Sequence, residues 1–505
     1  MKNMIKNRIQ KFCSNCSFLI FVAAAMVLSP AALAAGQQSQ RHVSHVDKSG
    51  QWVEIETAIN QLSRSKTPKA TSLLPPGVIW QAVDAISITN SVCVSDTTNE
   101  TWVGHNLNSE RLAYHETTGD GTAIFDYLLT NPSMVAVASA ENVSLGVVLE
   151  RHGAGGSTVY AFNEANGNVP IWTYDFAVNY NFNNIRNIDV AADGQVVIAA
   201  ARDTMAGTSL VVILDGATGA ELDSLTVNAG VGGVELNDSG TRAVLTAGAT
   251  VLVIDTTTMN TLFSFAVSGA GGFQRISRDG TTVAGGGFNC FVYQEIAGVW
   301  TQIYSLTHAS NWLGNGLALS ANGDTLFLVS YNYATGYLTL TYRVIDLVNN
   351  IEIAQFITQG AGGLQDTVIQ SQASADGETL AVISWGTQDN VHPEVQIFDR
   401  DLNLIGSIDT PGSPFGLDMS SDGQFVVVGS KSVHANISGN GSNTYAYRVF
   451  SACPWDLNGD GSISTLDLLA LFAQWGTAGS ADFDGSGVVG TSDLLILFAN
   501  WGPCP

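Results

Sequence analysis

The chain has 505 residues, and its 44 Asp and Glu residues outnumber its 20 Lys and Arg residues, which gives a formal net charge of −24. This charge opposes binding to a phosphate backbone, so nucleic acid is excluded as an expected partner. Hydrophobic residues make up 45% of the sequence, which excludes a disordered acidic chain. Charged residues make up only 13% and glycine occurs 52 times, which favours β-strands joined by tight turns over helical bundles.

The chain begins with the features of a secretory signal peptide. A basic start precedes a short apolar run at residues 18–28, and a small-residue cleavage site follows at residues 32–34. The apolar run is too short to cross a bilayer, and no later apolar run is long enough either. We therefore expect residues 1–34 to be removed on export, which leaves a secreted or cell-surface protein without a transmembrane segment. Residues 35–78 are expected to form a polar lead-in or linker.

A short motif recurs through the middle of the chain. It consists of an apolar strand, a turn of the type Ser/Ala-x-Asp/Asn-Gly and a second apolar strand, and Asp-Gly or Asn-Gly tolerates the positive φ of a tight hairpin. Each repeat offers about four short strands, which is the pattern of a β-propeller blade. A lone repeat could not bury both faces of its sheet, so the repeats must stack around an axis. The turn glycines, separated by 40 to 54 residues, are Gly194, Gly240, Gly280, Gly323, Gly377 and Gly423.

Eight such repeats, two of them degenerate, predict a mainly β protein with an eight-bladed propeller over residues 79–451; a seven-bladed ring is the alternative. The last repeat, at residues 414–450, has only three strands, and we expect the run at residues 78–88 to supply its fourth. The region resembles the WD-repeat and quinoprotein-like propeller superfamilies. That resemblance implies an architecture and does not specify an activity.

Residues 453–505 contain a duplicated motif with an offset of 26 residues. Each copy has a 12-residue loop rich in Asp and Gly, followed by an apolar run at helical spacing that ends in Trp-Gly. Oxygen ligands at positions 1, 3, 5, 7, 9 and 12 with glycine at position 6 fit a calcium loop. We predict a small α-helical domain with two calcium sites, in which the apolar helix faces pack together. The predicted ligands are Asp456, Asn458, Asp460, Ser462, Ser464 and Asp467 in the first loop, and Asp482, Asp484, Ser486, Val488 and Asp493 in the second.

Two further expectations concern this tail. The second loop has glycine at position 9, so water must replace that ligand and the first site should bind calcium more tightly. Cys453 and Cys504 flank the tail and are expected to form a disulfide in an oxidising compartment. Cys93 and Cys290 lie in strand-like runs, and we expect them to be buried small hydrophobic residues.

The tail resembles the type I dockerin family over residues 453–505, in a variant with Trp-Gly helix ends and flanking cysteines. The resemblance implies calcium-dependent docking onto a cohesin-like or other cell-surface protein. It also implies that positions 10 and 11 of the loops carry recognition. In this sequence those positions are Thr465, Leu466, Thr491 and Ser492.

The sequence names no catalytic residues. It contains no His-Glu-x-x-His, no Gly-x-Ser-x-Gly and no phosphate-binding Gly-x-x-x-x-Gly-Lys loop. Longer loops carry Tyr331, Tyr333, Tyr337 and Trp385, which either stack on sugars or partner side chains or pack between blades. We expect a secreted, non-catalytic binding or surface-display propeller, anchored by its calcium-dependent tail, with a protein or polysaccharide ligand. The alternative is a secreted carbohydrate-active enzyme, a glycoside hydrolase or lyase, carried by the same tail.

Overall fold

The structure is a computed structural model that describes residues 44–46, 52–54, 74–75, 77–449 and 455–503, apart from short internal gaps at 96, 107–109, 130–131, 269–272, 308–310, 314–315, 459–461 and 485. The predicted signal peptide, the predicted ligand Asp460 and both cysteines of the predicted disulfide, Cys453 and Cys504, lie outside the described residues. The chain divides into two compact units, one with residues 1–67 and 437–439 and the other with residues 68–436 and 440–505. In the first unit, β1 (Ser44–Val46) pairs antiparallel with β2 (Trp52–Glu54). None of the helices that the structure describes has the length and apolar character needed to cross a membrane.

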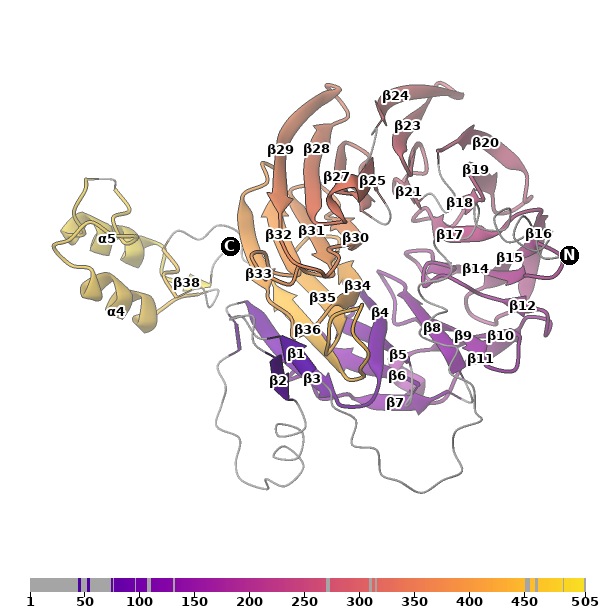
Figure 1. Cartoon of the computed structure of the whole chain (residues 1–505), viewed down its shortest axis with the longest axis horizontal. Helices are drawn as coiled ribbons and strands as arrows, with labels where there is room; N and C mark the ends of the chain where they lie inside the picture. Colours follow the sequence, from indigo (N-terminus) through magenta and orange to yellow (C-terminus); the bar gives the residue numbers. More distant parts are fainter. Residues whose placement is uncertain are drawn as a thin grey trace, which may run out of the picture. The chain divides into compact units, whose positions relative to one another are not determined.

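Eight antiparallel sheets stand around a common axis, one for each predicted blade (Figure 1). Blade 1 contains β4 (Ile88–Val94), β5 (Glu100–Asn106), β6 (Arg111–Glu116) and β7 (Phe125–Leu128). Blade 2 contains β8 (Pro132–Ser139), β9 (Gly146–His152), β10 (Ser157–Phe162) and β11 (Trp172–Asp175). Blade 3 contains β12 (Tyr180–Asn181), β13 (Ile188–Val190), β14 (Val196–Asp203), β15 (Thr208–Asp215) and β16 (Glu221–Val227). Blade 4 contains β17 (Val231–Leu236), β18 (Arg242–Ala247), β19 (Thr250–Asp255) and β20 (Thr261–Ala266).

The second half of the ring continues the same order. Blade 5 contains β21 (Phe273–Ile276), β22 (Thr282–Gly286), β23 (Asn289–Ile296) and β24 (Val299–Thr307). Blade 6 contains β25 (Asn311–Trp312), β26 (Leu317–Leu319), β27 (Thr325–Asn332), β28 (Thr339–Asp346) and β29 (Ile351–Gln359). Blade 7 contains β30 (Val368–Ala373), β31 (Thr379–Ser384), β32 (Val395–Asp399) and β33 (Leu404–Ile408). Blade 8 contains β34 (Pro414–Met419), β35 (Phe425–Lys431), β36 (Ser442–Arg448) and β3 (Val78–Asp84).

The ring is closed by a strand from the other end of the propeller sequence. β3 pairs antiparallel with β36, with Trp80 opposite Ala446, and forms the outer strand of blade 8. The innermost strand of blade 1, β4, contacts β8 on one side and β34 on the other. Eight blades and the origin of the eighth blade's fourth strand are therefore confirmed, and the seven-bladed alternative is wrong.

The recurring sequence motif forms a turn that uses its own side chains. In blade 5, Ser277 Oγ donates a hydrogen bond to Asp279 Oδ1 at 2.6 Å and accepts one from the Thr282 amide at 2.9 Å. The Gly280 amide donates to the Ser277 carbonyl at 2.9 Å. Such local bonds favour a hairpin at this point of the chain. The same serine-centred pattern recurs in blades 6, 7 and 8 at Ser320, Ser374 and Ser420.

The turns also join neighbouring blades. In each case a main-chain amide of one turn donates to a carbonyl of the turn in the following blade, for example Ala192 to Asp238 at 3.0 Å and Ala375 to Ser421 at 2.6 Å. Links of this kind connect the turns of blades 1 to 8 in order and form a belt of hydrogen bonds at one end of the ring. The turn motif therefore joins blade to blade as well as reversing the chain.

Two features of the turns require glycine, the backbone conformation and the close packing on the neighbouring blade. Gly377 has a φ of +74°, a conformation that side chains disfavour. A Cβ on Gly377 would also lie 2.5 Å from the side chain of Thr325, which begins β27 of the preceding blade. Gly423 meets Thr379 in the same way, and Gly323 meets Thr282. The glycine therefore lets each turn pack closely on the blade before it.

The apolar core is divided among the junctions between blades. In the described residues, each of the eight junctions has its own cluster of buried apolar side chains drawn from both neighbouring blades. Cys93 and Cys290 belong to two of these clusters and are buried free thiols, as predicted. The fold is therefore held by blade-on-blade packing rather than by a single central core.

The tail forms α4 (Thr465–Ala473) and α5 (Thr491–Ala499), with a two-stranded pairing of β37 (Ser462–Ile463) and β38 (Gly502–Pro503). A small core gathers around the buried Leu471 and Leu497, with Leu468 and Leu494 partly buried against it. The prediction that the whole apolar run of each helix faces this core is wrong for six residues. A nine-residue helix buries one narrow side here, and the structure leaves Leu469, Phe472, Trp475, Leu495, Phe498 and Trp501 exposed.

Candidate functional site

The second predicted calcium loop brings three carboxylates together. One oxygen from each of Asp482, Asp484 and Asp493 lies within 4.8 Å of the other two. The loop is shaped by the buried Asp493, whose Oδ1 accepts from the Phe483 amide at 2.7 Å and whose Oδ2 accepts from the Gly490 amide at 2.7 Å. Convergent carboxylate oxygens are the ligands that calcium takes, so these residues fit such an ion. The other predicted ligands of this loop, Ser486 and Val488, are exposed.

The first loop repeats this arrangement. The buried Asp467 accepts from the amides of Leu457 and Ser464, both at 2.8 Å. Leu457 and Ser464 lie 26 residues before Phe483 and Gly490, the equivalent donors of the second loop, so the two loops fold in the same way around their buried aspartates. Ser464 also caps α4, because its side chain accepts from the Leu466 amide at 3.2 Å. The remaining predicted ligands described in this loop are Asp456, Asn458 and Ser462.

The predicted recognition residues lie on the first turns of the two helices. Thr465 and Leu466 begin α4, and Thr491 and Ser492 begin α5, and all four are exposed. At the end of each helix an exposed Phe on the last turn and an exposed Trp just beyond it form an apolar patch. The ring centroids are 5.7 Å apart for Phe472 and Trp475 and 5.5 Å apart for Phe498 and Trp501. The sequence did not reveal these patches, because the same residues lie at the spacing expected for a buried helix face.

On the propeller, the tyrosine loop of blade 6 divides into a packing residue and surface residues. Tyr331 is buried at the end of β27, whereas Tyr333, the first residue of the short helix η3 (Tyr333–Thr335), and Tyr337, which follows that helix, reach the surface. The Tyr333 and Tyr337 rings meet edge to face with centroids 5.0 Å apart. The two interpretations of these aromatic residues, blade packing and ligand stacking, therefore apply to different residues.

Hydrogen bonds through one histidine connect loops of blades 6 to 8 beside these tyrosines. β31 runs away from its turn and ends at Ser384, so the loop that follows lies at the end of the ring opposite the belt of turns. His434 Nε2 lies 3.0 Å from the Gly386 carbonyl and 3.2 Å from the Gln365 carbonyl. Because a carbonyl only accepts, Nε2 carries the proton, and Nδ1 accepts from the Asn436 amide at 3.1 Å. A neutral histidine thus joins three loops, and burial lowers its pKa accordingly.

Two carboxyl groups are buried beneath the same loops. Asp366 accepts from the Gly386 amide at 2.9 Å, and Glu394 accepts from the Thr410 amide at 2.8 Å. Burial raises the pKa of Asp366 and raises that of Glu394 to about 7. Asp366 is 3% exposed and Glu394 is 7% exposed. Because both groups are shielded and hold main-chain amides, they position loops and do not offer an accessible acid–base pair.

Trp385 completes this arrangement, which we call the loop face and define by Tyr333, Tyr337, Trp385, Gln388 and Asn436. The Trp385 carbonyl accepts from Ser413 Oγ at 2.8 Å, and the partly exposed Trp385 ring lies edge to face with the His434 ring, at 6.2 Å between centroids. Gln388 and Asn436 are exposed amides on the same loops. Only the aromatic residues could be found from the sequence, since the other contacts join segments up to 71 residues apart.

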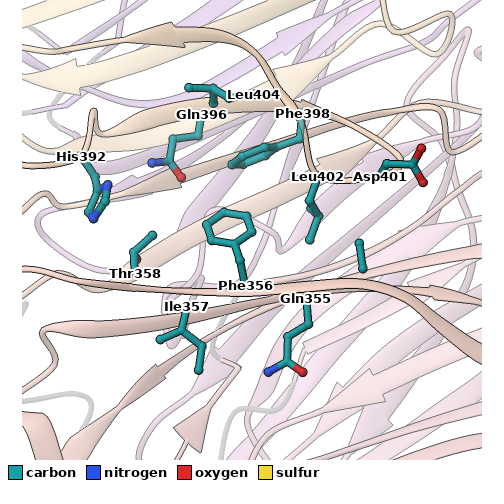
Figure 2. Close-up of a pocket in the computed structure, with 11 residues that line it drawn as sticks. Gln355, Phe356, Ile357, Thr358, His392, Gln396, Phe398, Asp401, Leu402 and Leu404 are labelled. Atoms are coloured by element: carbon teal, nitrogen blue, oxygen red, sulfur yellow. The ribbon is translucent and has the colours of Figure 1, made fainter.

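A groove of about 460 Å³ lies on the side of the ring between blades 6 and 7 (Figure 2). Figure 2 shows Phe356 of β29 and Phe398 of β32 turned toward each other, with His392 and Gln396 at one end and Asp401 and Leu402 at the other. The buried Tyr342 hydroxyl donates to Gln396 Oε1 at 2.8 Å behind these rings. The groove therefore has an apolar floor and a polar rim, and it suits a ring or an aliphatic group.

Neither a family model nor a curated protein matches the sequence, so the resemblance of residues 453–505 to dockerins has no support of that kind. Among solved structures, the fold is similar to the Dos1 propeller, with 12% identity, a TM-score of 0.52, and coverage of 75% of this chain and 98% of that chain. It is also similar to BamB from Moraxella catarrhalis (12% identity, TM-score 0.49, 72% and 100% covered) and to the C-terminal WD40 domain of Sif2 (14%, 0.49, 72% and 98%). The chain thus contains a β-propeller, and at these identities the likeness concerns the fold alone.

Proposed function

We propose that the protein is an exported, non-catalytic binding propeller that its calcium-folded tail anchors to a cohesin-like or other cell-surface protein. The observation that carries the binding role is the hydrogen-bonded loop face, in which His434 fixes three loops around Gly386. A surface held in place before a ligand arrives loses little conformational freedom on binding. The buried state of Asp366 and Glu394 favours binding over hydrolysis.

The ligand we propose for the loop face is a neutral polysaccharide. Surface aromatic rings such as Tyr333 and Trp385 stack on the apolar faces of sugars, and the amides of Gln388 and Asn436 suit sugar hydroxyls. His392 lines the side groove and follows Trp385 in the same loop, so a long chain could continue from the loop face into the groove. A protein ligand is the other outcome that the test below separates.

The test is a pull-down of the full chain, in saturating calcium, on a panel of insoluble neutral polysaccharides, together with a reducing-sugar assay. We expect retention without product release, and a loss of at least tenfold in affinity for Trp385→Ala and Tyr333→Ala. Trp300→Ala is the matched control, because Trp300 lies on the outer strand β24, away from the loop face. Release of reducing ends would instead establish the carbohydrate-active enzyme, and failure to bind any polysaccharide would refute the proposed ligand.

The anchoring role depends on the exposed face of the tail. Thr465, Leu466, Thr491 and Ser492 are exposed on the first turns of the two helices, two Phe-Trp pairs are exposed as well, and exposed apolar patches of this kind mark interaction surfaces. We expect the full chain to bind a cohesin domain or an intact cell surface in calcium and to release it in EDTA. Binding that ignores both EDTA and the double variant Leu466→Ala/Trp475→Ala would refute the proposed anchoring.

A further inference from the structure

One buried position on the inner strands breaks a mostly apolar pattern. The residue six positions before each turn glycine is buried between blades, and it is Ile188, Val234, Leu317 or Leu417 in blades 3, 4, 6 and 8. In blade 5 the same position is Gln274, which is fully buried. Neither Gln274 Oε1 nor Gln274 Nε2 has a hydrogen-bond partner among the residues that the structure describes. An amide in an apolar position therefore points to something that it binds.

Two more polar side chains border Gln274 at the junction of blades 4 and 5. A Cβ on Gly233 would lie 2.9 Å from Gln274 Nε2 and 3.3 Å from Arg186 Cβ, and Arg186 Nη2 donates to the Gln274 carbonyl at 3.1 Å, so both residues lie against this glycine. Thr246 is the cross-strand partner of Gly233, and cross-strand partners project to the same side of a sheet. Thr246 Oγ1 and Arg186 Nη1 are both buried, and within the described chain neither has a partner.

The unpaired polar groups at this junction carry more donor hydrogens than acceptor oxygens. Arg186 Nη1 and Gln274 Nε2 each carry two N–H groups and the Thr246 hydroxyl carries one O–H, which makes five donor hydrogens against two acceptor oxygens, Gln274 Oε1 and Thr246 Oγ1. The complementary ligand is therefore an acceptor, and a small one, because even a Cβ on Gly233 would lie only 2.9 Å from Gln274 Nε2.

The charges agree with this choice. Arg186 Nη2 donates to Glu235 Oε2 at 3.0 Å, and Arg275 Nη1 donates to the same oxygen at 3.2 Å, so two guanidinium groups share one carboxylate. Asp189 is the second carboxylate near Arg186, and its Oδ2 already accepts from the Leu236 amide at 2.7 Å. The hydrogen bonds of Arg186 to Glu235 and to the Gln274 carbonyl both use Nη2, so Arg186 Nη1 stays without a partner among the described residues.

We propose that the junction of blades 4 and 5 binds a small monovalent anion, chloride or a carboxylate of the size of formate, between Arg186 Nη1, Gln274 Nε2 and the Thr246 hydroxyl. The anion joins blade 3, which carries Arg186, to blades 4 and 5. It therefore stabilises the folded ring and binds weakly or not at all to the unfolded chain.

The test combines thermal unfolding with crystallography, both on the full chain in saturating calcium gluconate. At constant ionic strength, replacing gluconate by chloride should raise the Tm by about 2 °C for each tenfold increase in chloride above its Kd. Crystals soaked in bromide should show one anomalous peak beside Arg186 and Gln274.

Gln274→Leu should fold, because Leu occupies this position in blades 6 and 8, and it should lose both the chloride response and the bromide peak. Ser371→Ala changes the only other polar residue at this position in blades 3 to 8 and should keep both. A Tm that ignores chloride, with or without a bromide peak, would mean ordered water or an adventitious ion only and would overturn the proposal. An unchanged chloride response in Gln274→Leu would also overturn it.

Discussion

His434 of blade 8 donates a hydrogen bond from Nε2 to the main-chain carbonyl of Gly386 in blade 7, over 3.0 Å. The amide of the same glycine donates to Asp366, so the peptide groups on both sides of Gly386 are held. A Cβ on Gly386 would lie 2.5 Å from Glu394 Oε1, and its φ is +80°. This glycine is therefore the point where a histidine and two buried carboxyl groups fix the loops of three blades.

Glu394 should make the stability of the propeller depend on pH. Its folded-state pKa is raised from 4.5 to about 7, so its stabilising protonated form is complete below about pH 4.5 and is lost as the pH rises through 7. Between pH 5 and pH 9 the free energy of unfolding of the wild type should fall by up to about 3 kcal/mol more than that of Glu394→Gln. Urea unfolding of both proteins at the two pH values measures this difference.

His434 acts in the opposite direction, which makes the two groups separable. Its folded-state pKa is lowered, so its contribution is present above its usual pKa of 6.5 and is lost as the pH falls below it. The free energy of unfolding of Glu394→Gln should still fall at acid pH, because His434 is unchanged. It should no longer fall as the pH rises through 7. Parallel curves for the two proteins would contradict the assignment to Glu394.

The turn glycines should be more sensitive to substitution than other glycines of the same backbone conformation. Gly377 has a φ of +74° and no room for a Cβ, whereas Gly207 has a φ of +75° and nothing within 4 Å of the same position. Gly207→Ala should cost about 1 kcal/mol from backbone strain alone, and Gly377→Ala about 3 kcal/mol, because Thr325 must also move. Thermal unfolding of the two variants isolates the contribution of blade packing. Equal costs would show that the belt of turns tolerates a wider spacing.

Calcium removal should affect the tail and leave the propeller folded. In the second loop, one oxygen from each of three carboxylates lies within 4.8 Å of the other two. These negative charges repel each other, and a bound cation removes the repulsion. In EDTA, limited proteolysis of the full chain should release the tail and spare residues 78–448, and calcium should protect both. Asp456→Ala should weaken calcium binding more than Asp482→Ala if the first site is tighter. Identical digestion patterns with and without EDTA would contradict the assignment of calcium.

The two sides of the tail helices should respond differently to truncation. Leu471 and Leu497 are fully buried, so Leu471→Ala should lower the free energy of unfolding of the tail by about 3 kcal/mol. Phe472 is 48% exposed, so Phe472→Ala should change it by less than about 1 kcal/mol and should instead weaken binding to the anchoring partner. Calcium-dependent unfolding followed by NMR of the tail resonances distinguishes the two effects. A large stability loss for Phe472→Ala would place that ring in a core.

The blade count could be predicted because the turn that defines it is local. Asp-Gly and Asn-Gly favour the backbone conformation of a tight turn whatever surrounds them. The last repeat has only three strands of its own and needs a fourth from elsewhere, which β3 supplies. The side of α4 that is buried could not be predicted, since Leu468, Leu471, Phe472 and Trp475 all fit one helical period. Packing against α5 and the loops selects Leu471 and leaves Phe472 and Trp475 outside.

The arrangement around Gly386 had no local signal either. Asp366, Glu394 and His434 are separated in sequence by 28 and 40 residues, and none of them belongs to a motif. Gln274 is different, because alignment of the repeats on their turn glycines shows a large polar residue where blades 3, 4, 6 and 8 have Ile, Val or Leu. The repeats of a single chain therefore contain enough information to single out this residue, although not the groups that surround it.

The pairing of β3 with β36 also has a consequence for biosynthesis. Trp80 of β3 is buried, and its Nε1 donates to the Thr117 carbonyl of blade 1 at 2.9 Å, so the closing strand joins both sides of the seam. This strand is the first part of the propeller to leave the ribosome, and its partner strand is the last. A chain that is still being synthesised must therefore carry an unpaired strand edge until the final blade has emerged. The seam should be the last part of the ring to fold and the first at which two chains could exchange strands.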